Sequence, residues 1–289
     1  MGVSMEDWLN NPEYLSSTLL VIMQNWYAAN YNTDGTYRKD LSATCRKQYG
    51  EIKQALIALE NDMHNLSIIY HQLLNVKNTT LEAGLKDLYF SNLTESYFTN
   101  IRSIYDHISC FPRIVLNEKD LEDKAAKTTS FNELLGFCDP KNTVKRQKAE
   151  KIYSENLLNS IEKSKADFEN VKKIRDAIIH HGKEPVVSNS EGNILFRIPI
   201  HVGNYNSNNI LPDILGFGDK EYPLMDYLQS VTIALFKNME CIGNCIGYEY
   251  IGREPSGLQY LYALIGICIK DFVNFVFPEG KRCLLNPNS

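Results

Sequence analysis

The chain has little of what marks several broad classes of protein. Positive charge is not in excess, because 30 Lys and Arg face 35 Asp and Glu, which gives a formal net charge of -5. A surface that is basic throughout is therefore excluded, whereas a local basic groove is not. The sequence also has no fixed-period repeat and no low-complexity tract. Repeat architectures and largely disordered chains are excluded on that ground.

Cysteine is sparse and scattered. Seven Cys stand singly among 289 residues, an odd number without a dense framework. This usage is typical of free thiols in a reducing compartment. Cys241 and Cys245 are separated by three residues and have no companion His and Cys cluster, so a helix interior is favoured over a zinc site. We therefore expect no metal and no cofactor.

Targeting and membrane-spanning signals are missing or incomplete. Residues Met1 to Ser17 contain no basic start followed by an apolar run, so no secretory signal is expected and a cytoplasmic location is favoured. The apolar segment Leu258 to Phe277 approaches the length of a membrane span. Lys270 and Asp271 fall inside it, and each is costly in hydrocarbon. A buried helix is the better interpretation, and no membrane partner is expected.

Helical patterns dominate the first two thirds of the chain. Apolar residues make up 44% and charged residues 22%, which is enough for a sizeable core. The spacing of apolar residues and the positions of Pro and Gly predict helices at Tyr14 to Asn30, Lys39 to Val76, Leu81 to Phe111 and Thr143 to His181. One face of the third helix is expected to carry Leu81, Leu85, Leu88, Tyr97, Ile101, Ile104 and Ile108. The polar connector Asn117 to Asn142 is expected to hold one short helix near Phe131 to Phe137.

The composition changes after Gly182. The segment Pro185 to Ile200 predicts a β-hairpin, a loop follows, and helices return at Tyr222 to Tyr250 and Leu258 to Phe277. The expected fold class is mainly α, an antiparallel helical bundle with a small β-hairpin insertion. We expect three parts: a helical bundle over 1–182, the hairpin and loop insertion over 183–221, and C-terminal helices over 222–289 that pack on the same bundle.

One constellation of residues carries chemistry, at the end of the predicted helix Thr143 to His181. The apolar stripe of this helix holds Tyr153, Leu157, Ile161, Phe168, Val171 and Ile178. Arg175 is expected near the middle of that inward stripe, where a guanidinium is costly unless a carboxylate, a phosphate or a cavity receives it. Asp176 follows directly, and His180 and His181 come one turn later.

The spacing of Arg and His alone is a weak signal. Arg102 and His107 have the same spacing in the helix Leu81 to Phe111. Arg102 is expected on the flank of its apolar stripe, four residues before Asp106, where a surface ion pair is the simple account. The inward placement of Arg175 and the polar residue after it favour Arg175 as the functional arginine.

The string Ile174-Arg-Asp-Ala-Ile-Ile-His-His-Gly182 resembles the motif of the HEPN domain superfamily, in which Arg is followed by four to six residues and His. The resemblance is close over these nine residues and extends loosely, as helical organisation, over Leu81 to Gly182. It implies a metal-independent endoribonuclease that works as a homodimer and leaves a 2′,3′-cyclic phosphate and a 5′-hydroxyl. It also implies a toxin, stress or phage-defence setting, with an antitoxin or another regulatory partner.

The chemistry suits these residues. The RNA supplies its own nucleophile, Arg175 would hold the scissile phosphate, and His180 would act as acid and base. Asp176 lies four residues before His180 and would orient the imidazole, with His181 as the alternate base. The RNA backbone would be tracked by Lys172, Lys173 and Lys183. A straight helix separates residues five apart by about 140°, so Arg175 and His180 converge only if the last turn loosens or if two copies face each other across a two-fold axis.

Two other hypotheses stay open. Basic residues near a helix C-terminus oppose its dipole without any chemistry, and Arg175 can serve as an ion-pair partner of a carboxylate on another helix. The chain would then be a catalytically silent helical module that dimerises and binds a nucleotide or a partner protein. A small-molecule or metal enzyme needs clustered ligands that the sequence does not supply.

Overall fold

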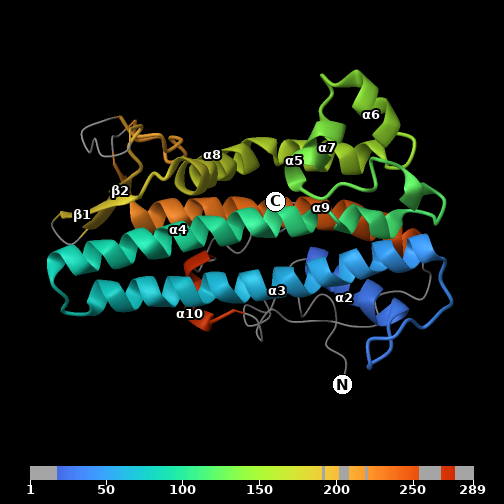
Figure 1. The fold of residues 1–289 in the computed structure, drawn as a ribbon, viewed down its shortest axis with the longest axis horizontal. Coiled ribbons are helices and arrows are strands. Elements are labelled where there is room, and N and C mark those ends of the chain that lie inside the picture. The colour runs from blue at the N-terminus through green and yellow to red at the C-terminus, as the bar shows by residue number, and fades with distance from the viewer. Residues whose placement is uncertain (1–17, 191–192, 202–207, 219–220, 254–267, 277–289) are drawn as a thin grey trace.

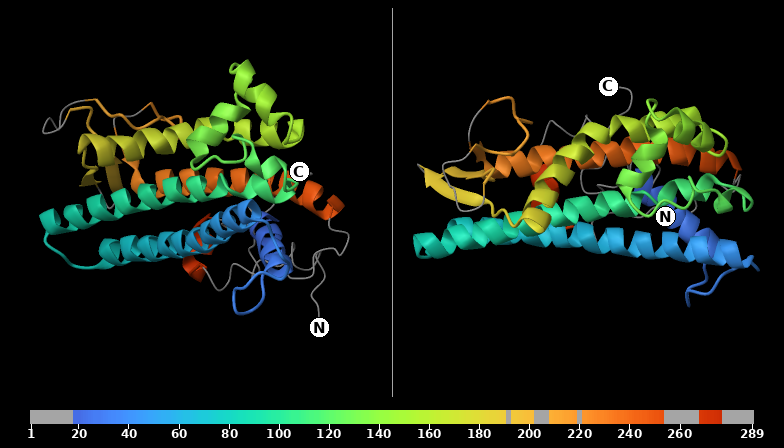
Figure 2. Two further views of the ribbon diagram at one scale, coloured as in Figure 1. Left: turned by 45° about the vertical axis from the view of Figure 1, so that its right-hand side comes forward. Right: turned by 45° about the horizontal axis from the view of Figure 1, so that its top comes forward.

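The fold is mainly α-helical with a small antiparallel sheet, as predicted. The computed structural model describes residues 18–190, 193–201, 208–218, 221–253 and 268–276. The long helices α3 (Ala43–Asn78), α4 (Ala83–Ile108) and α9 (Leu224–Arg253) run along the length of the molecule, and α8 (Lys165–His181) packs on α4 and α9 (Figures 1 and 2). Shorter elements are α2 (Thr18–Asn30), η1 (Phe111–Val115), η2 (Asp120–Glu122), α5 (Phe131–Cys138), α6 (Thr143–Ala149), α7 (Glu155–Lys163) and α10 (Lys270–Val276).

Helix α3 begins four residues later than predicted. Ser42 is its N-cap, and the Ser42 hydroxyl accepts a hydrogen bond from the amide of Cys45. The preceding residues form a tight turn closed by a bridge between Tyr31 and Tyr37, so the predicted start at Lys39 is wrong. The short connector helix near Phe131 is confirmed as α5.

The predicted apolar face of α4 is only half right. Tyr97, Ile101, Ile104 and Ile108 are fully buried, whereas Leu85 and Leu88 expose 44% and 65% of their surface. Leu88 and Tyr97 are nine residues apart, which turns them about 180° from each other on a helix, so they cannot share one face. Phe90 and Thr94 are buried at this end of α4 instead, and the two leucines remain at the surface.

The predicted single helix Thr143 to His181 is wrong, because the segment forms α6, α7 and α8. Ser154 caps α7 by accepting from the amide of Leu157, and Ser164 ends it with its hydroxyl on the carbonyl of Ile161. These serines offer the backbone local hydrogen bonds that compete with a continuous helix. The apolar stripe is nevertheless buried throughout, at Tyr153, Leu157, Ile161, Phe168, Val171 and Ile178.

The predicted hairpin is confirmed as β1 (Val186–Ser190) and β2 (Asn193–Arg197), paired antiparallel. A third strand, β3 (Tyr222–Pro223), adds antiparallel to β2 with Tyr222 opposite Phe196. The prediction that Tyr222 begins a helix is therefore wrong, and α9 starts at Leu224. Phe196 packs against the ring of Tyr227 on α9, with ring centroids 5.2 Å apart, which joins the sheet to the helical core.

The predicted C-terminal helix Leu258 to Phe277 lies mostly outside the described residues, which include α10. Residues 14–17 of the first predicted helix also lie outside them. Of the helices that the structure describes, none is both long enough and apolar enough to cross a bilayer.

Helices α2 and α9 cross so closely that a glycine is needed between them. A Cβ atom at Gly243 would lie 2.4 Å from the backbone nitrogen of Leu19, whereas a Cβ at Gly247 would lie 3.1 Å from the side chain of Ile22. Backbone cannot move aside without separating the helices, but the end of an isoleucine side chain can.

We expect Gly243→Ala to lower the free energy of unfolding by about 1–3 kcal/mol, because the added methyl group forces α2 away from α9. Gly247→Ala is the matched control, and its clash is offset by the better helix propensity of alanine. Thermal unfolding followed by circular dichroism measures both. Equal midpoints for the two variants would contradict the close crossing at Gly243.

Candidate functional site

The candidate site lies at the C-terminal end of α8, which remains a regular helix up to His181. Gly182 ends the helix in the left-handed conformation, with φ of 58°. The amides of Gly182 and Lys183 both donate to the carbonyl oxygen of Ala177. Glycine adopts this conformation without the steric cost of a Cβ atom, which explains why the helix stops here.

Three motif residues meet at this end of α8. Arg175 Nη1 lies 2.7 Å from Nε2 of His180 and 3.2 Å from Oδ1 of Asp176. The side chains of Arg175, Asp176 and His180 are 30%, 35% and 60% exposed, so the cluster lies at the surface. A guanidinium therefore joins the carboxylate to the imidazole within reach of solvent.

The prediction that Arg175 points into the apolar interior is wrong. Ile174 and Ile178 are buried, whereas Arg175 lies at the edge of the apolar face and is half-buried. Its long side chain reaches around the helix to His180, so the two residues meet without loosening the last turn. Neither of the two expected routes to convergence is needed within one copy of the chain.

The contact between Asp176 and His180 is weaker than predicted. His180 Nε2 and Asp176 Oδ1 are 3.8 Å apart, which is too long for a hydrogen bond. Arg175 instead holds the imidazole, and because a guanidinium can only donate, Nε2 of His180 must be the acceptor.

The other predicted site residues are less closely associated with this cluster. His181 is exposed at the last position of α8. Lys172 donates to the side-chain oxygen of Asn132 on α5 at 2.9 Å, and it lies 3.8 Å from Glu169. Lys173 is exposed and Lys183 is partly buried beside the helix end. The cations thus surround α8 rather than converging on one point.

The second Arg and His pair is built differently. Arg102 pairs with Asp106, as predicted, and its guanidinium lies 4.6 Å from the ring centre of Phe168. His107 Nε2 lies 3.0 Å from Oδ2 of Asp62 on α3. The two residues therefore interact with separate carboxylates, and Arg102 is 14% exposed, less than a surface pair would be. This pair joins helices and does not form a shared cluster.

Helix α8 is held in place by polar contacts that the sequence patterns did not reveal. Asn238 of α9 donates both to Oδ2 of Asp167 and to the hydroxyl of Tyr105, each at 3.0 Å. Lys165 Nζ lies 2.8 Å from Oδ2 of Asp139, and this partner lowers the pKa of the Asp139 carboxyl. Asn238 is one of three amide side chains in α9, and nothing in the sequence distinguishes it from Gln229 and Asn244 as the partner of α8.

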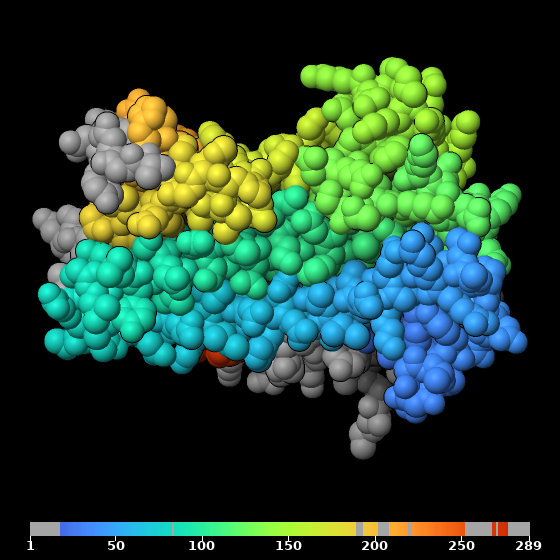
Figure 3. Space-filling model, in the orientation of Figure 1, coloured from blue at the N-terminus to red at the C-terminus, as the bar shows by residue number. Residues whose placement is uncertain are grey.

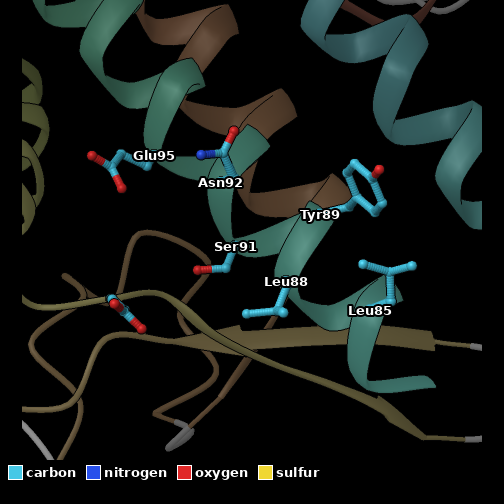
Figure 4. A pocket seen from close by; sticks show the side chains of 7 residues that line it. Leu85, Leu88, Tyr89, Ser91, Asn92 and Glu95 are labelled. Atoms are coloured by element: carbon cyan, nitrogen blue, oxygen red, sulfur yellow. The ribbon is translucent and has the colours of Figure 1, made fainter. Parts of the chain in front are cut away.

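A shallow pocket of about 390 Å³ lies near the end of α8, along one side of α4 (Figure 4). Leu85, Leu88 and Tyr89 form its apolar part, and we call these three side chains the α4 patch. Its polar lining comprises Ser91, Asn92, Glu95 and Glu184. Glu184 belongs to the linker after α8, so the pocket adjoins the candidate site. In the space-filling view, α8 forms surface between the hairpin and the protruding helices α5 to α7 (Figure 3).

Among the described residues, no group of three or more His, Cys, Asp and Glu side chains could hold a metal ion. Cys241 is exposed on α9. Burial raises the pKa of the Cys138 and Cys268 thiols to about 12, so neither is an activated nucleophile.

Compared with family models, with curated proteins and with solved structures, the chain gives no match.

Proposed function

We propose that the chain is a metal-independent endoribonuclease of the HEPN type, with its site at the end of α8. The observation that supports this most directly is the 2.7 Å contact between Arg175 Nη1 and His180 Nε2 in an exposed cluster. The motif thereby brings a phosphate-binding group and an acid–base group within the span of a single phosphodiester.

The cluster suggests how substrate would engage it. A phosphodiester takes over the N–H groups of Arg175 and releases the lone pair on Nε2 of His180. The imidazole then accepts the proton of the ribose 2′-hydroxyl as the 2′-oxygen bonds to phosphorus. The bond from phosphorus to the 5′-oxygen breaks, and that oxygen takes a proton from an imidazolium or from water. Arg175 stabilises the charge that grows on the phosphate oxygens. His181 is the alternate base.

The test is cleavage of single-stranded RNA by the purified chain in EDTA. Cleavage is expected to persist in the chelator and to leave 2′,3′-cyclic phosphate and 5′-hydroxyl ends, which end-group analysis detects. An RNA with a 2′-deoxy nucleotide at the cleaved position should resist. Loss of cleavage in EDTA, or cleavage of the deoxy substrate, would rule out this mechanism.

We propose further that the chain acts as a homodimer in the cytoplasm, in a toxin, stress or phage-defence setting with an antitoxin or another regulatory partner. The α4 patch supports the dimer, because three large apolar side chains, each at least 44% exposed, lie together near the end of α8. A second copy that covered this patch would bring two motifs closer and would double the local positive charge.

Leu88→Glu is expected to weaken the dimer at least about tenfold, because it places a charge in the proposed interface. Sedimentation velocity over a range of protein concentrations measures the change. Ile57→Glu is the matched control, since Ile57 is an exposed apolar residue on α3, 48% accessible, outside the α4 patch. A monomeric wild type, or equal weakening by both variants, would contradict this interface.

A second candidate function is a catalytically silent helical module that binds a nucleotide or a partner protein. The observation that favours it is the ion pair between Arg175 and Asp176, which already satisfies part of the guanidinium in the free chain. This alternative predicts no RNA cleavage under any condition, together with dimerisation that survives Arg175→Ala. The cleavage assay therefore separates the two functions.

A further inference from the structure

We propose that the chain has a second binding site, for the phosphate group of a small soluble molecule, at the start of α3. The site is a pocket of about 420 Å³ lined by Tyr37, Arg38, Lys39, Asp40 and Arg46, which we call the Arg38–Arg46 pocket. Its volume falls within the range of about 300–1,000 Å³ found for small-molecule sites.

Two guanidinium groups that line this pocket are held in place by hydrogen bonds to backbone carbonyl oxygens. Nε of Arg38 donates to the carbonyl oxygen of Tyr31 at 2.7 Å, and Nε of Arg46 donates to the carbonyl oxygen of Leu41 at 2.9 Å. Each arginine thus uses its Nε–H to hold its orientation, and of the terminal nitrogens Nη2 of Arg46 lies 3.8 Å from Oδ1 of Asp40. Pre-oriented guanidinium forks match the geometry of phosphate oxygens and lose less entropy on binding.

The turn that precedes α3 and carries Arg38 is held against α3 by hydrogen bonds. Residues Tyr31 and Tyr37 form a bridge, and the Tyr37 hydroxyl donates to the carbonyl oxygen of Arg46 at 2.7 Å. Lys53 of α3 donates to the carbonyl oxygen of Gly35 at 3.3 Å and lies 4.8 Å from the ring centre of Tyr31. The turn before α3 is therefore braced against the helix rather than attached only through its ends.

The electrostatics of the pocket favour an anion. Arg38, Lys39 and Arg46 contribute three positive charges against the single negative charge of Asp40. Asp40 weakly opposes this, because its carboxylate is fully exposed and lies 3.8 Å from Arg46. The 36-residue helix α3 starts next to the pocket and has no acidic residue in its first turn, where the neutral hydroxyl of Ser42 caps the amide of Cys45, so no carboxylate of the helix opposes its positive end.

Two acidic groups approach the start of α3 from other parts of the chain. Glu122 of η2 accepts a hydrogen bond from the hydroxyl of Thr44 at 2.9 Å, and Glu118 lies close to the thiol of Cys45. Neither carboxylate lines the pocket, whose own side chains carry three positive charges against one negative charge. The charge distribution at the pocket is thus opposite in sign to the chain as a whole, whose net charge is -5.

This pocket is separate from the motif at the end of α8. The start of α3 and the end of α8 lie toward opposite ends of the molecule (Figure 1), and α3 alone spans about 54 Å at 1.5 Å per residue. The proposal is therefore independent of the ribonuclease activity, and each can fail without the other.

The test is isothermal titration calorimetry of the full chain with inorganic phosphate and with pyrophosphate. Saturable binding that weakens as salt is added is expected for the wild type. The double variant Arg38→Gln, Arg46→Gln should bind at least about tenfold more weakly, because it removes both charges while keeping side chains that can donate to the same carbonyl groups. Lys39→Gln should weaken binding less, since one mobile charge is lost.

Lys47→Gln is the matched control, because Lys47 is exposed next to Arg46 but does not line the pocket. Its affinity should stay within twofold of the wild type, and thermal unfolding checks that every variant is folded. The proposal is overturned if the wild type shows no saturable phosphate binding, or if Lys47→Gln loses as much as the double variant. It is also overturned if only a single-stranded RNA, and neither phosphate probe, loses affinity in the double variant, since the pocket would then belong to a polynucleotide.

Discussion

His180→Ala is expected to lower the rate of RNA cleavage by about 100- to 10,000-fold, the usual contribution of a positioned acid–base group. The imidazole is exposed and its Nε2 lies 2.7 Å from Arg175 Nη1, so its removal leaves no equivalent base in the same position. Arg175→Ala is expected to cost about 100- to 1,000-fold, because the phosphate loses its charged donor. Single-turnover cleavage of a labelled RNA measures both effects.

His107 provides a matched control for this experiment, and His181 tests the alternate base. His107→Ala removes the histidine of the other Arg and His pair, which contacts Asp62 and not its own arginine, and it should leave cleavage within about threefold of the wild type. Full loss on His181→Ala with little loss on His180→Ala would transfer the acid–base role to His181. Unchanged cleavage in both Arg175→Ala and His180→Ala would remove the site from α8 altogether.

Arg113→Ala is expected to lower the free energy of unfolding by about 3–5 kcal/mol. Arg113 is 1% exposed and donates to Gln48 at 2.7 Å, to Glu51 at 2.5 Å and to the carbonyl oxygen of Thr128. Its removal leaves a cavity and deprives the buried Gln48 and Thr128 of their donor. The thermal midpoint should fall by roughly 5–15 °C, measured by circular dichroism.

Comparison with Glu51→Gln shows how much of the stability that Arg113 contributes comes from its ion pair with Glu51. The Glu51 side chain is 37% exposed, so water can solvate what the variant leaves behind and a loss of about 1 kcal/mol is expected. Arg113→Met should fall between the two variants, because it fills much of the volume but donates no hydrogen bond. If Arg113→Ala cost no more than Glu51→Gln, the network around Arg113 would contribute little to stability.

Local patterns predicted the helical class and the hairpin, but not the exact element ends. Turn residues located the end of α8 at Gly182, whereas the Ser42 cap was missed and the start of α3 was predicted four residues too early. They failed in the segment before His181, where Ser154 and Ser164 interrupt an apolar stripe that runs from Tyr153 through the two helices α7 and α8. The stripe survives the breaks because burial is set by tertiary packing, which the sequence period alone does not encode.

The sequence singled out Arg175, Asp176 and His180, which lie close together in the structure, but it did not predict the geometry of their contacts. Projecting Arg175 and His180 on a helical wheel compares only the directions in which side chains leave the backbone. It ignores that an arginine side chain is long enough to reach around the helix and contact an imidazole that leaves the backbone in another direction, as Arg175 does with His180. The supporting contact from Asn238 was also out of reach, because it joins residues 71 positions apart.

The linker between α8 and β1 is short, and this has a mechanical consequence. Residues 182–185 alone connect the helix that carries the motif to the hairpin, and the left-handed glycine at their start fixes the exit direction. Phe196 of β2 packs on Tyr227 of α9, so the hairpin and the end of α8 are positioned by the same helical core. A change in the length of residues 182–185 would therefore displace the last turn of α8, and with it the imidazole of His180, from that core.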